Sequence, residues 1–372
     1  MTIRIFNPEH DIALASNMER FTAPHAGRQL RSDLCYLPAL WSNDGDVVIV
    51  DDIDFAESAY RKLKAERKPV VEFCTMEQIA HVLSSTNIAP VIDAWGWDLA
   101  IRFQLLSSGV PEKKLPSKDA MQELRRLSGR QCTTIVLENI RRGIESETCG
   151  KSTYLVDYDG FCDLLQNDKS IVVKAPWSSS GRGVRYFLEG ERNENAINWV
   201  RNTIRLQGGV MVEPLYNKVK DFGMEFRRDA EGRVHYLGLS LFNTINGAYT
   251  GNLLTTEAVK RDIMSRYIDL ALLDNVTARL ETELASLFST LPSEPAISDL
   301  HFGVDMMIVT REDGNGFLLH PCVETNMRRT MGHVALTLTP PPLAPKRMMR
   351  IIHDVNYKLK INDLGNNFIQ TL

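Results

Sequence analysis

The first third of the chain alternates short apolar runs with segments of helical periodicity, and this alternation constrains the fold more than any other feature. Apolar runs suited to β-strands occur at 2–6, 47–50 and 70–73, and apolar positions follow a helical spacing at 31–40 and 55–66. Strands that alternate with helices are typical of a parallel sheet covered by helices. The sequence therefore predicts an α/β fold that begins with a parallel-sheet domain.

The rest of the chain predicts two further regions in which strands and helices are mixed, so the fold class is α/β with α+β parts. Proline-containing breaks near residue 115 and after the expected strand at 209–213 divide the chain into domains 1–115, 116–213 and 214–372. Helices are expected at 99–106, 119–127, 133–139, 158–165, 195–206, 261–291 and 345–354. Strands are expected at 153–156, 171–174, 209–213, 223–227, 234–241, 303–309 and 317–324.

Composition narrows the class of protein. The 372 residues are 44% hydrophobic, which is enough to bury a full core, and the formal net charge is −4. This charge disfavours general binding to nucleic acids or anionic membranes, because phosphate backbones attract clustered positive charge. No apolar stretch approaches the roughly 20 residues that span a bilayer, and the six cysteines lack the paired spacing of a zinc site or disulfide framework. We expect a cytoplasmic protein with reduced thiols and without nucleic-acid or membrane partners.

The segment 171–184 predicts a phosphate-binding loop. Its apolar strand ends in Lys174, and the loop Ala-Pro-Trp-Ser-Ser-Ser-Gly-Arg-Gly follows directly. Backbone N–H groups and hydroxyls of such a loop can surround phosphate oxygens, while the lysine adds a positive charge. The loop has neither the Walker A spacing nor the glycine spacing of a dinucleotide-binding turn. A hairpin loop that is merely rich in turn-forming residues is the alternative.

A second polar set lies on an expected hairpin whose turn spans 312–316. Side chains alternate along a strand, so Glu324, Asn326 and Arg328 share one face, which Asp305 can join from the partner strand. Two carboxylates and an amide oxygen suit a Mg²⁺ ion that also keeps phosphate oxygens and water, and a guanidinium can face the same phosphates. An exposed polar face that holds a surface ion pair is the alternative.

Together, the loop and the hairpin resemble the ATP-grasp superfamily, whose members bind ATP between a lid domain and a larger C-terminal domain. The resemblance covers about residues 116–335 and implies an ATP-grasp fold preceded by a Rossmann-like pre-ATP-grasp domain. In this family a lysine precedes the phosphate loop, as Lys174 precedes 178–183 here. A second basic residue heads an earlier helix that ends in Gly-Ile. Arg130 matches that position, where lysine is usual, and Gly143-Ile144 matches the helix end.

The resemblance extends to the nucleotide and metal positions. The segment 209–215 resembles the family's inter-domain hinge, which contacts adenine mainly through its backbone. An acidic residue that holds the ribose is matched by Asp221, with Glu225 as its rival. The nucleotide-binding residues implied are Arg130, Lys174, Ser178, Ser179, Ser180, Gly181, Gly183, Glu213, Pro214, Leu215 and Asp221. The metal ligands implied are Asp305, Glu324 and Asn326, and the catalytic residues are Arg328 and Lys174.

The activity that the resemblance implies is an ADP-forming carboxylate–amine ligase. The carboxylate would be activated as an acyl phosphate, which an amine or a thiol then attacks, while loop 177–183 closes to keep water out. ATP and one or two Mg²⁺ ions, replaceable by Mn²⁺, would be the cofactors, and a small-molecule carboxylate and amine the partners. A homodimer is common in the family. An ATP-grasp small-molecule kinase and a non-catalytic nucleotide-binding protein are the alternatives.

Two further segments have open roles. Asn7-Pro8-Glu9-His10-Asp11 follows the first expected strand, and ligands favour the carboxyl ends of parallel strands. His10 could therefore contact a substrate, or it could simply cap a loop. The polar, glycine-rich segment 242–252 could be a substrate-binding loop or a plain connection. The sequence does not identify the carboxylate or the amine.

Overall fold

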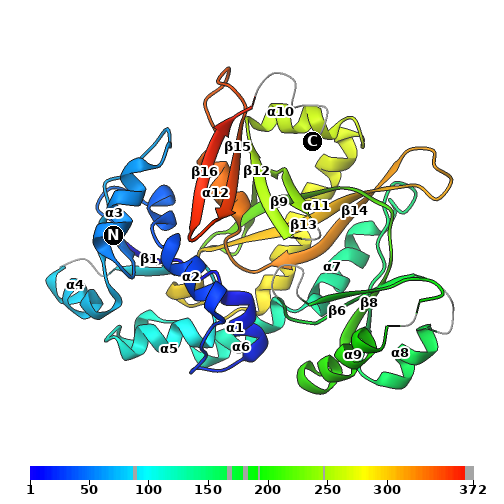
Figure 1. Ribbon diagram of the computed structural model, residues 1–372, viewed down its shortest axis with the longest axis horizontal. Helices are drawn as coiled ribbons and strands as arrows, with labels where there is room; N and C mark the ends of the chain where they lie inside the picture. The colour runs from blue at the N-terminus through cyan, green and yellow to red at the C-terminus, as the bar shows by residue number, and fades with distance from the viewer. Residues whose placement is uncertain (87–89, 166–169, 179–182, 192, 246–247, 365–372) are drawn as a thin grey trace.

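The structure is a computed structural model that describes residues 1–86, 90–165, 170–178, 183–191, 193–245 and 248–364. Within these residues, four sheets of four strands each form the framework. The N-terminal sheet lies on the left of Figure 1, a small sheet with β6 and β8 lies at the lower right, and the other two lie between and above them. The mixed α/β fold predicted from the sequence is confirmed. No helix in the described residues is both long and apolar enough to cross a membrane.

The first sheet is parallel throughout, as predicted. Its strands are β1 (Thr2–Ile5), β2 (Val47–Ile49), β3 (Glu72–Cys74) and β4 (Val91–Ala94), in the order β3-β2-β1-β4. The third strand lies slightly further along the chain than the expected 70–73. Ile3 is buried and pairs with Val47 on one side and with Ile92 on the other. Because β1 and β4 are parallel neighbours, the residues that follow these two strands meet at one edge of the sheet.

Short helices accompany this sheet. They are α1 (His10–Ser16), α2 (His25–Asp33), η1 (Leu37–Trp41), α3 (Ile53–Lys62), η2 (Met76–Gln78), α4 (Ile79–Ser85), α5 (Leu99–Ser107) and η3 (Glu112–Lys114). The helix expected at 31–40 is wrong, because α2 ends at Asp33 and a separate 3₁₀ segment follows. Pro38 explains the break, since proline is tolerated in the first turn of η1 but not inside a continuous helix.

The second sheet is small and antiparallel. Its strands are β5 (Thr153–Leu155), β6 (Ile171–Lys174), β7 (Val184–Phe187) and β8 (Val210–Pro214), in the order β5-β8-β6-β7. Helices α8 (Tyr158–Leu165) and α9 (Glu194–Gln207) pack on it around Phe161, Val173 and Val200. All of these elements except β7, for which no strand was predicted, match their predictions closely. The sheet holds Lys174 at the end of a central strand.

The third sheet is antiparallel and carries the predicted hairpin. Its strands are β9 (Lys218–Arg228), β10 (Val234–Ser240), β13 (Leu300–Thr310) and β14 (Phe317–Asn326), in the order β10-β9-β13-β14. Helices α6 (Lys118–Leu127), α7 (Arg130–Arg141), α10 (Glu257–Met264) and α11 (Leu270–Leu287) and the segments η4 (Phe288–Thr290) and η5 (Pro295–Ile297) accompany it. The single helix expected at 261–291 is therefore two helices, and Asp269 caps the second.

The fourth sheet corrects a prediction. It consists of β11 (Phe242–Ile245), β12 (Ala248–Leu254), β15 (Arg347–His353) and β16 (Tyr357–Asp363), with α12 (Met331–Thr337) nearby. The helix expected at 345–354 is wrong, because this segment is a strand paired with β12 and β16. Methionine and arginine favour helices by themselves, but pairing on both edges of the strand overrides that weak preference. Segment 242–252, left open from the sequence, lies in the hairpin formed by β11 and β12.

Candidate functional site

The hairpin of β13 and β14 brings the three expected metal ligands together. Asp305 pairs directly with Glu324, and Gly303 pairs with Asn326 in the same ladder. The amide Nδ2 of Asn326 donates a hydrogen bond of 3.1 Å to Oδ2 of Asp305. The three side chains that strand periodicity assigned to one face therefore form one polar cluster. Its position is set by backbone register rather than by loop geometry.

The electrostatics of this cluster favour a cation. Burial and the neighbouring Glu324 carboxylate together raise the pKa of Asp305 to about 7, although the Asn326 hydrogen bond opposes the shift. A divalent cation would relieve the repulsion between the two carboxylates. In the described part of the chain, no group of three His, Cys, Asp or Glu side chains could hold a metal ion by itself. Two carboxylates and one amide nevertheless fit Mg²⁺, which is usually held by one or two carboxylates plus phosphates and water.

Arg130 connects this cluster to the expected phosphate loop. It is buried at the start of α7, and its Nη2 lies 2.7 Å from Oε1 of Glu324. Its Nη1 donates to the carbonyl of Ala175 at 2.5 Å and to Oγ of Ser178 at 2.8 Å. The buried Nε of Arg130 has no hydrogen-bond partner among the described residues. A buried guanidinium with an unused N–H donor is suited to bind an anionic ligand such as a phosphate.

Lys174 lies at the end of β6, as predicted, and is paired rather than free. Its Nζ lies 2.5 Å from Oε2 of Glu213 on the neighbouring strand β8, and both side chains are buried. Pro214 and Leu215 follow, and the N–H of Leu215 donates to the carbonyl of Ser170 at 3.1 Å. The sheet therefore places the expected lysine beside the expected hinge.

The two ends of the phosphate loop approach each other. The N–H of Ala175 donates to the carbonyl of Gly183 at 2.8 Å. A Cβ at Gly183 would lie 2.2 Å from Oγ of Ser178, so this close approach requires glycine. Ser179, Ser180, Gly181 and Arg182, which the prediction included, lie outside the described residues. Loop closure stays a prediction.

The two candidates for the ribose differ in their surroundings. Asp221 is partly buried on β9 and accepts hydrogen bonds from Lys218 at 2.6 Å and from Thr244 at 2.8 Å. Glu225 lies deeper, where it contacts Thr330 at 2.8 Å and His333 at 2.9 Å. Because both contacts hold Glu225 within the protein, Asp221 is the better placed of the two.

Arg328 occupies a different place from the one predicted. The strand β14 ends at Asn326, so Arg328 follows a turn and does not continue the strand. Its Nε and Nη2 donate to the two carboxylate oxygens of Asp11 at 2.8 and 2.7 Å, and Nη2 also contacts Oδ1 of Asn326 at 3.2 Å. Burial opposes the charge of Arg328, but Asp11 outweighs it and raises the pKa of the guanidinium. Arg328 still reaches the cluster, joined to the N-terminal helix α1.

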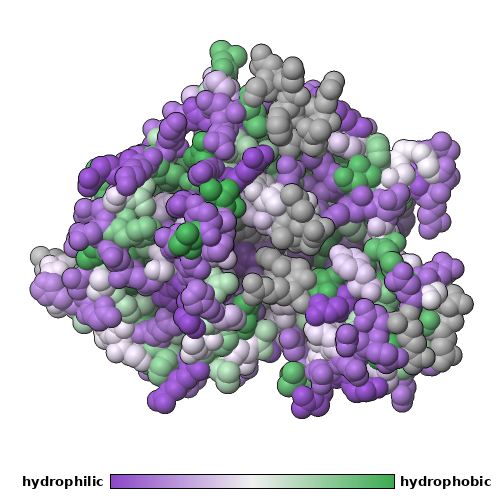
Figure 2. Space-filling view, viewed as in Figure 1, coloured by the Kyte–Doolittle hydropathy of each residue, from purple (hydrophilic) through white to green (hydrophobic). Residues whose placement is uncertain are grey.

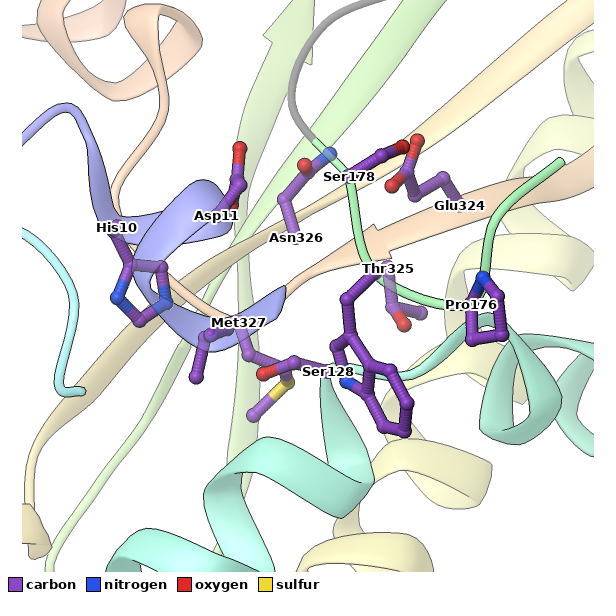
Figure 3. Close-up of a pocket in the computed structure, with 11 residues that line it drawn as sticks. His10, Asp11, Ser128, Pro176, Ser178, Glu324, Thr325, Asn326 and Met327 are labelled. Atoms are coloured by element: carbon purple, nitrogen blue, oxygen red, sulfur yellow. The ribbon is translucent and has the colours of Figure 1, made fainter. Parts of the chain in front are cut away.

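One pocket is lined by residues from four separate segments of the chain. It is lined by His10, Asp11, Leu14, Ser128, Pro176, Trp177, Ser178, Glu324, Thr325, Asn326 and Met327 (Figure 3). A hydrophilic hollow is also visible near the centre of the face in Figure 2. Sequence reasoning raised His10 as a candidate but missed Asp11. The segment that contains both residues, at the carboxyl end of β1, was the only sequence signal that could have indicated Asp11.

Comparisons with known proteins give structural matches only. No family model matches the chain, and no curated protein matches its sequence. An N5-carboxyaminoimidazole synthetase from Staphylococcus aureus, complexed with ADP, has 12% identity and a TM-score of 0.48, and the match covers 94% of this chain and 82% of that one. Biotin carboxylase from Campylobacter jejuni has 12% identity and a TM-score of 0.49, covering 94% and 75%.

A third match is an ATP-grasp superfamily protein from Archaeoglobus fulgidus, with 13% identity and a TM-score of 0.44, covering 98% of this chain and all of that one. It bears the name of the superfamily that the motifs resemble. Because the identities are low and the TM-scores lie below 0.5, these likenesses carry no argument about what the chain binds or catalyses.

Proposed function

We propose that this protein is an ATP-grasp enzyme that activates a carboxylate as an acyl phosphate, with ADP as product, for attack by an amine or a thiol. The observation that carries the proposal is the position of Arg130. Its guanidinium contacts the phosphate loop at Ala175 and Ser178 and the carboxylate cluster at Glu324. Two motifs that are far apart in the sequence therefore contribute to one site, as phosphate transfer from a nucleotide requires.

The cationic side chains near the loop and the cluster would have different roles in binding the phosphates. Lys174 and Arg130 are buried beside the loop and can hold phosphate oxygens in place of part of their present contacts. Glu213 keeps the Lys174 ammonium at the end of β6. Arg328 lies against Asn326 and would neutralise charge on the phosphoryl group during transfer, which is the main catalytic task in this chemistry.

The carboxylate cluster would hold the metal. Asp305, Glu324 and Asn326 would bind one or two Mg²⁺ ions, which supply charge neutralisation and orientation of the phosphates when bound. Asp221 would hold the ribose, while the hinge residues Glu213, Pro214 and Leu215 would contact the adenine base. The division of the chain at residues 115 and 213 is part of this proposal.

The test combines nucleotide binding with turnover. The protein is mixed with MgATP and a panel of carboxylic acids and amines, and ADP release is followed by mass analysis of the product. Lys174→Ala should raise the KM for ATP and lower kcat together, by roughly 10- to 100-fold in kcat/KM, because the lysine contacts phosphates in both ground and transition states. Lys174→Arg should restore only part of the activity.

The control separates binding from stability. Removing Lys174 alone leaves the buried Glu213 carboxylate unpaired, which destabilises a protein by about 3–5 kcal/mol. The double variant Lys174→Met with Glu213→Gln should recover most of that stability but none of the ATP affinity. Lys358→Ala, at an exposed ion pair with Asp354, should change neither property. Unchanged ATP affinity and turnover in Lys174→Ala would contradict the proposal, and a phosphorylated acceptor without amide would indicate a kinase.

A further inference from the structure

A buried histidine–carboxylate pair lies on the N-terminal side of the pocket. His10 follows β1 at the start of α1, and Asp98 follows β4 before α5. Nδ1 of His10 lies 3.0 Å from Oδ2 of Asp98, and the two residues are 1% and 2% exposed. The pair exists because β1 and β4 are adjacent parallel strands, so that their carboxyl ends meet.

The hydrogen bonds around Asp98 determine which nitrogen of His10 carries the proton. Oδ1 of Asp98 accepts the backbone N–H of Ile101 at 2.9 Å, and Oδ2 accepts the amide of Asn7 at 3.2 Å. The carboxylate is thus purely an acceptor, and Nδ1 of His10 must donate to it. In its neutral form the imidazole has a single N–H, so Nε2 is then an acceptor with a free lone pair.

The backbone is shaped to hold the ring in this orientation. A Cβ at Gly96 would lie 2.6 to 2.7 Å from three atoms of the His10 imidazole, so the ring rests where only glycine leaves room. Asn7 fastens the same segment, since its amide donates to the carbonyl of Gly96 at 2.8 Å. The imidazole can therefore hardly turn away from Asp98.

The free nitrogen lies at the pocket. Nε2 of His10 is buried and has no hydrogen-bond partner within the described part of the chain. His10 lines the same pocket as Asp11, Glu324 and Asn326, and in Figure 3 one ring nitrogen lies on the side of Met327. Leaving a buried acceptor without a donor is unfavourable. Such a group in a pocket is expected to meet a donor on a ligand.

We propose that His10 is the general base for the second half of the reaction, and that the nucleophile is a primary amine that arrives as an ammonium ion. This inference rests on the proposed ligase function. Asp98 acts as the residue that positions His10. The other charges near the ring are Asp11, paired with Arg328, and Glu9, paired with Arg31 at 2.8 Å. Because arginines neutralise both of these carboxylates, the unpartnered acceptor at Nε2, and not a net charge, is what favours a substrate that brings an N–H donor.

The proposed step balances as follows. Nε2 of His10 takes one proton from the ammonium group, and the freed nitrogen lone pair attacks the carbonyl carbon of the acyl phosphate. The C–N bond forms, the bond between the carbonyl carbon and the phosphate oxygen breaks, and phosphate leaves with that electron pair. The departing phosphate takes the second proton from nitrogen, which leaves a neutral amide and a protonated imidazole. The imidazole then returns its proton to solvent.

The experiment compares two nucleophiles. A panel of amino acids, dicarboxylic acids and hydroxy acids is supplied with MgATP and either hydroxylamine or a panel of primary amines. Hydroxylamine is largely uncharged at neutral pH and attacks acyl phosphates without a base. In His10→Ala we expect amide formation to fall by roughly 100-fold or more, the usual contribution of a general base, while hydroxamate formation stays within about threefold. His81→Ala, at an exposed histidine on α4, should change neither rate.

A second variant and a spectroscopic readout test the pair without relying on turnover. Asp98→Asn keeps a side-chain oxygen for the N–H of Ile101 but can donate to His10, so it should move the ring proton to Nε2. Nitrogen NMR of histidine-labelled protein should show an unprotonated Nε2 in the wild type and a protonated one in this variant. Amide formation should fall in parallel, again with hydroxamate formation preserved.

The outcomes are distinct. Equal losses of amide and hydroxamate in a folded His10→Ala variant, unchanged rates of both, or a protonated Nε2 in the wild type would overturn the role of His10 alone. A wild-type protein that binds MgATP but forms neither product with any acid would overturn the proposed ligase function, and the role of His10 with it.

Discussion

The two sides of the pocket bring their polar side chains together in different ways. On the hairpin side, Asp305 and Glu324 are directly opposite each other on adjacent antiparallel strands. On the N-terminal side, His10 and Asp98 are 88 positions apart in the chain and meet only because their parallel strands are neighbours. A site on one hairpin can therefore be inferred from residue spacing, whereas a site at the edge of a parallel sheet depends on strand order.

The largest expected effect is on the hairpin side. Glu324→Gln removes one negative charge from the proposed metal site but keeps an oxygen that can accept the Arg130 hydrogen bond. We expect at least about a 100-fold loss of turnover, because losing a charged ligand at a phosphoryl-transfer centre costs several kcal/mol of transition-state stabilisation. Amide and hydroxamate formation should fall together, unlike in His10→Ala. Rates are measured over a range of Mg²⁺ concentrations, with thermal unfolding as a check on the fold.

Glu312→Gln is the matched control, because Glu312 is exposed in the turn of the same hairpin. Near-normal turnover of Glu324→Gln at low Mg²⁺ would contradict the metal assignment. If Glu324→Gln lost amide formation but kept hydroxamate formation, the two sides of the pocket would no longer have different roles. Both would then act on the nucleophile.

The hairpin side was predictable because two rules act over short distances. The side-chain period of two put Glu324 and Asn326 on one face, and the turn at 312–316 indicated that Asp305 lay on the partner strand. The rule fails where the strand ends. Arg328 was assigned to the same strand face, yet β14 stops at Asn326 and the guanidinium turns to Asp11.

The N-terminal side could be predicted only in outline. The sequence indicated a parallel sheet but contained no pattern that orders β4 next to β1, so Asp98 had no reason to be linked to His10. The helix wrongly expected at 345–354 has a similar cause. Its residues form β15 because β12 and β16 pair with both edges, and such partners are distant in the sequence. Contacts that depend on the order of strands in a sheet cannot be predicted from a local sequence pattern.

Breaking the ion pair between Asp11 and Arg328, which links the two sides of the pocket, should give an intermediate effect. Burial by itself would raise the pKa of Asp11, but the Arg328 guanidinium outweighs burial and holds the pKa below its usual range. Asp11→Asn leaves the buried guanidinium without its counter-charge, which should destabilise the protein by about 3 kcal/mol. It should also lower kcat by roughly tenfold through misplacement of Arg328. Thermal unfolding and steady-state rates measure the two effects.

A matched pair on the surface serves as the control. Arg227 contacts both oxygens of Asp299 at 2.8 and 2.7 Å, the same bidentate geometry, but both side chains are exposed. Asp299→Asn should cost less than about 1 kcal/mol, because solvent screens exposed ion pairs. If Asp11→Asn and Asp299→Asn lowered the free energy of unfolding equally, the Asp11–Arg328 ion pair would contribute no more than a surface ion pair.

The smallest effect concerns a second buried histidine, on the hairpin side. His320 is 1% exposed on β14, and neither ring nitrogen has a hydrogen-bond partner among the residues that the structure describes. Gly150 lies against one face, and Tyr216 meets the ring edge-on at 5.7 Å. His10 has the Asp98 carboxylate as its partner, so the two residues contrast a partnered and an unpartnered buried imidazole.

Burial, together with the positive charges of Lys174 and Arg141, lowers the pKa of His320 to about 3. In the unfolded chain the pKa is near 6.5, so below that pH the unfolded state binds a proton that the folded state does not. The free energy of unfolding should therefore fall as the pH drops, by up to about 1.4 kcal/mol per pH unit, or about 2 kcal/mol between pH 7.5 and 5. His320→Phe keeps the ring contact with Tyr216 and should lack this component of the pH dependence, as denaturant titrations at several pH values would measure. Parallel pH curves for the variant and the wild type would show that His320 finds a donor or acceptor in solution, and the contrast with His10 would then disappear.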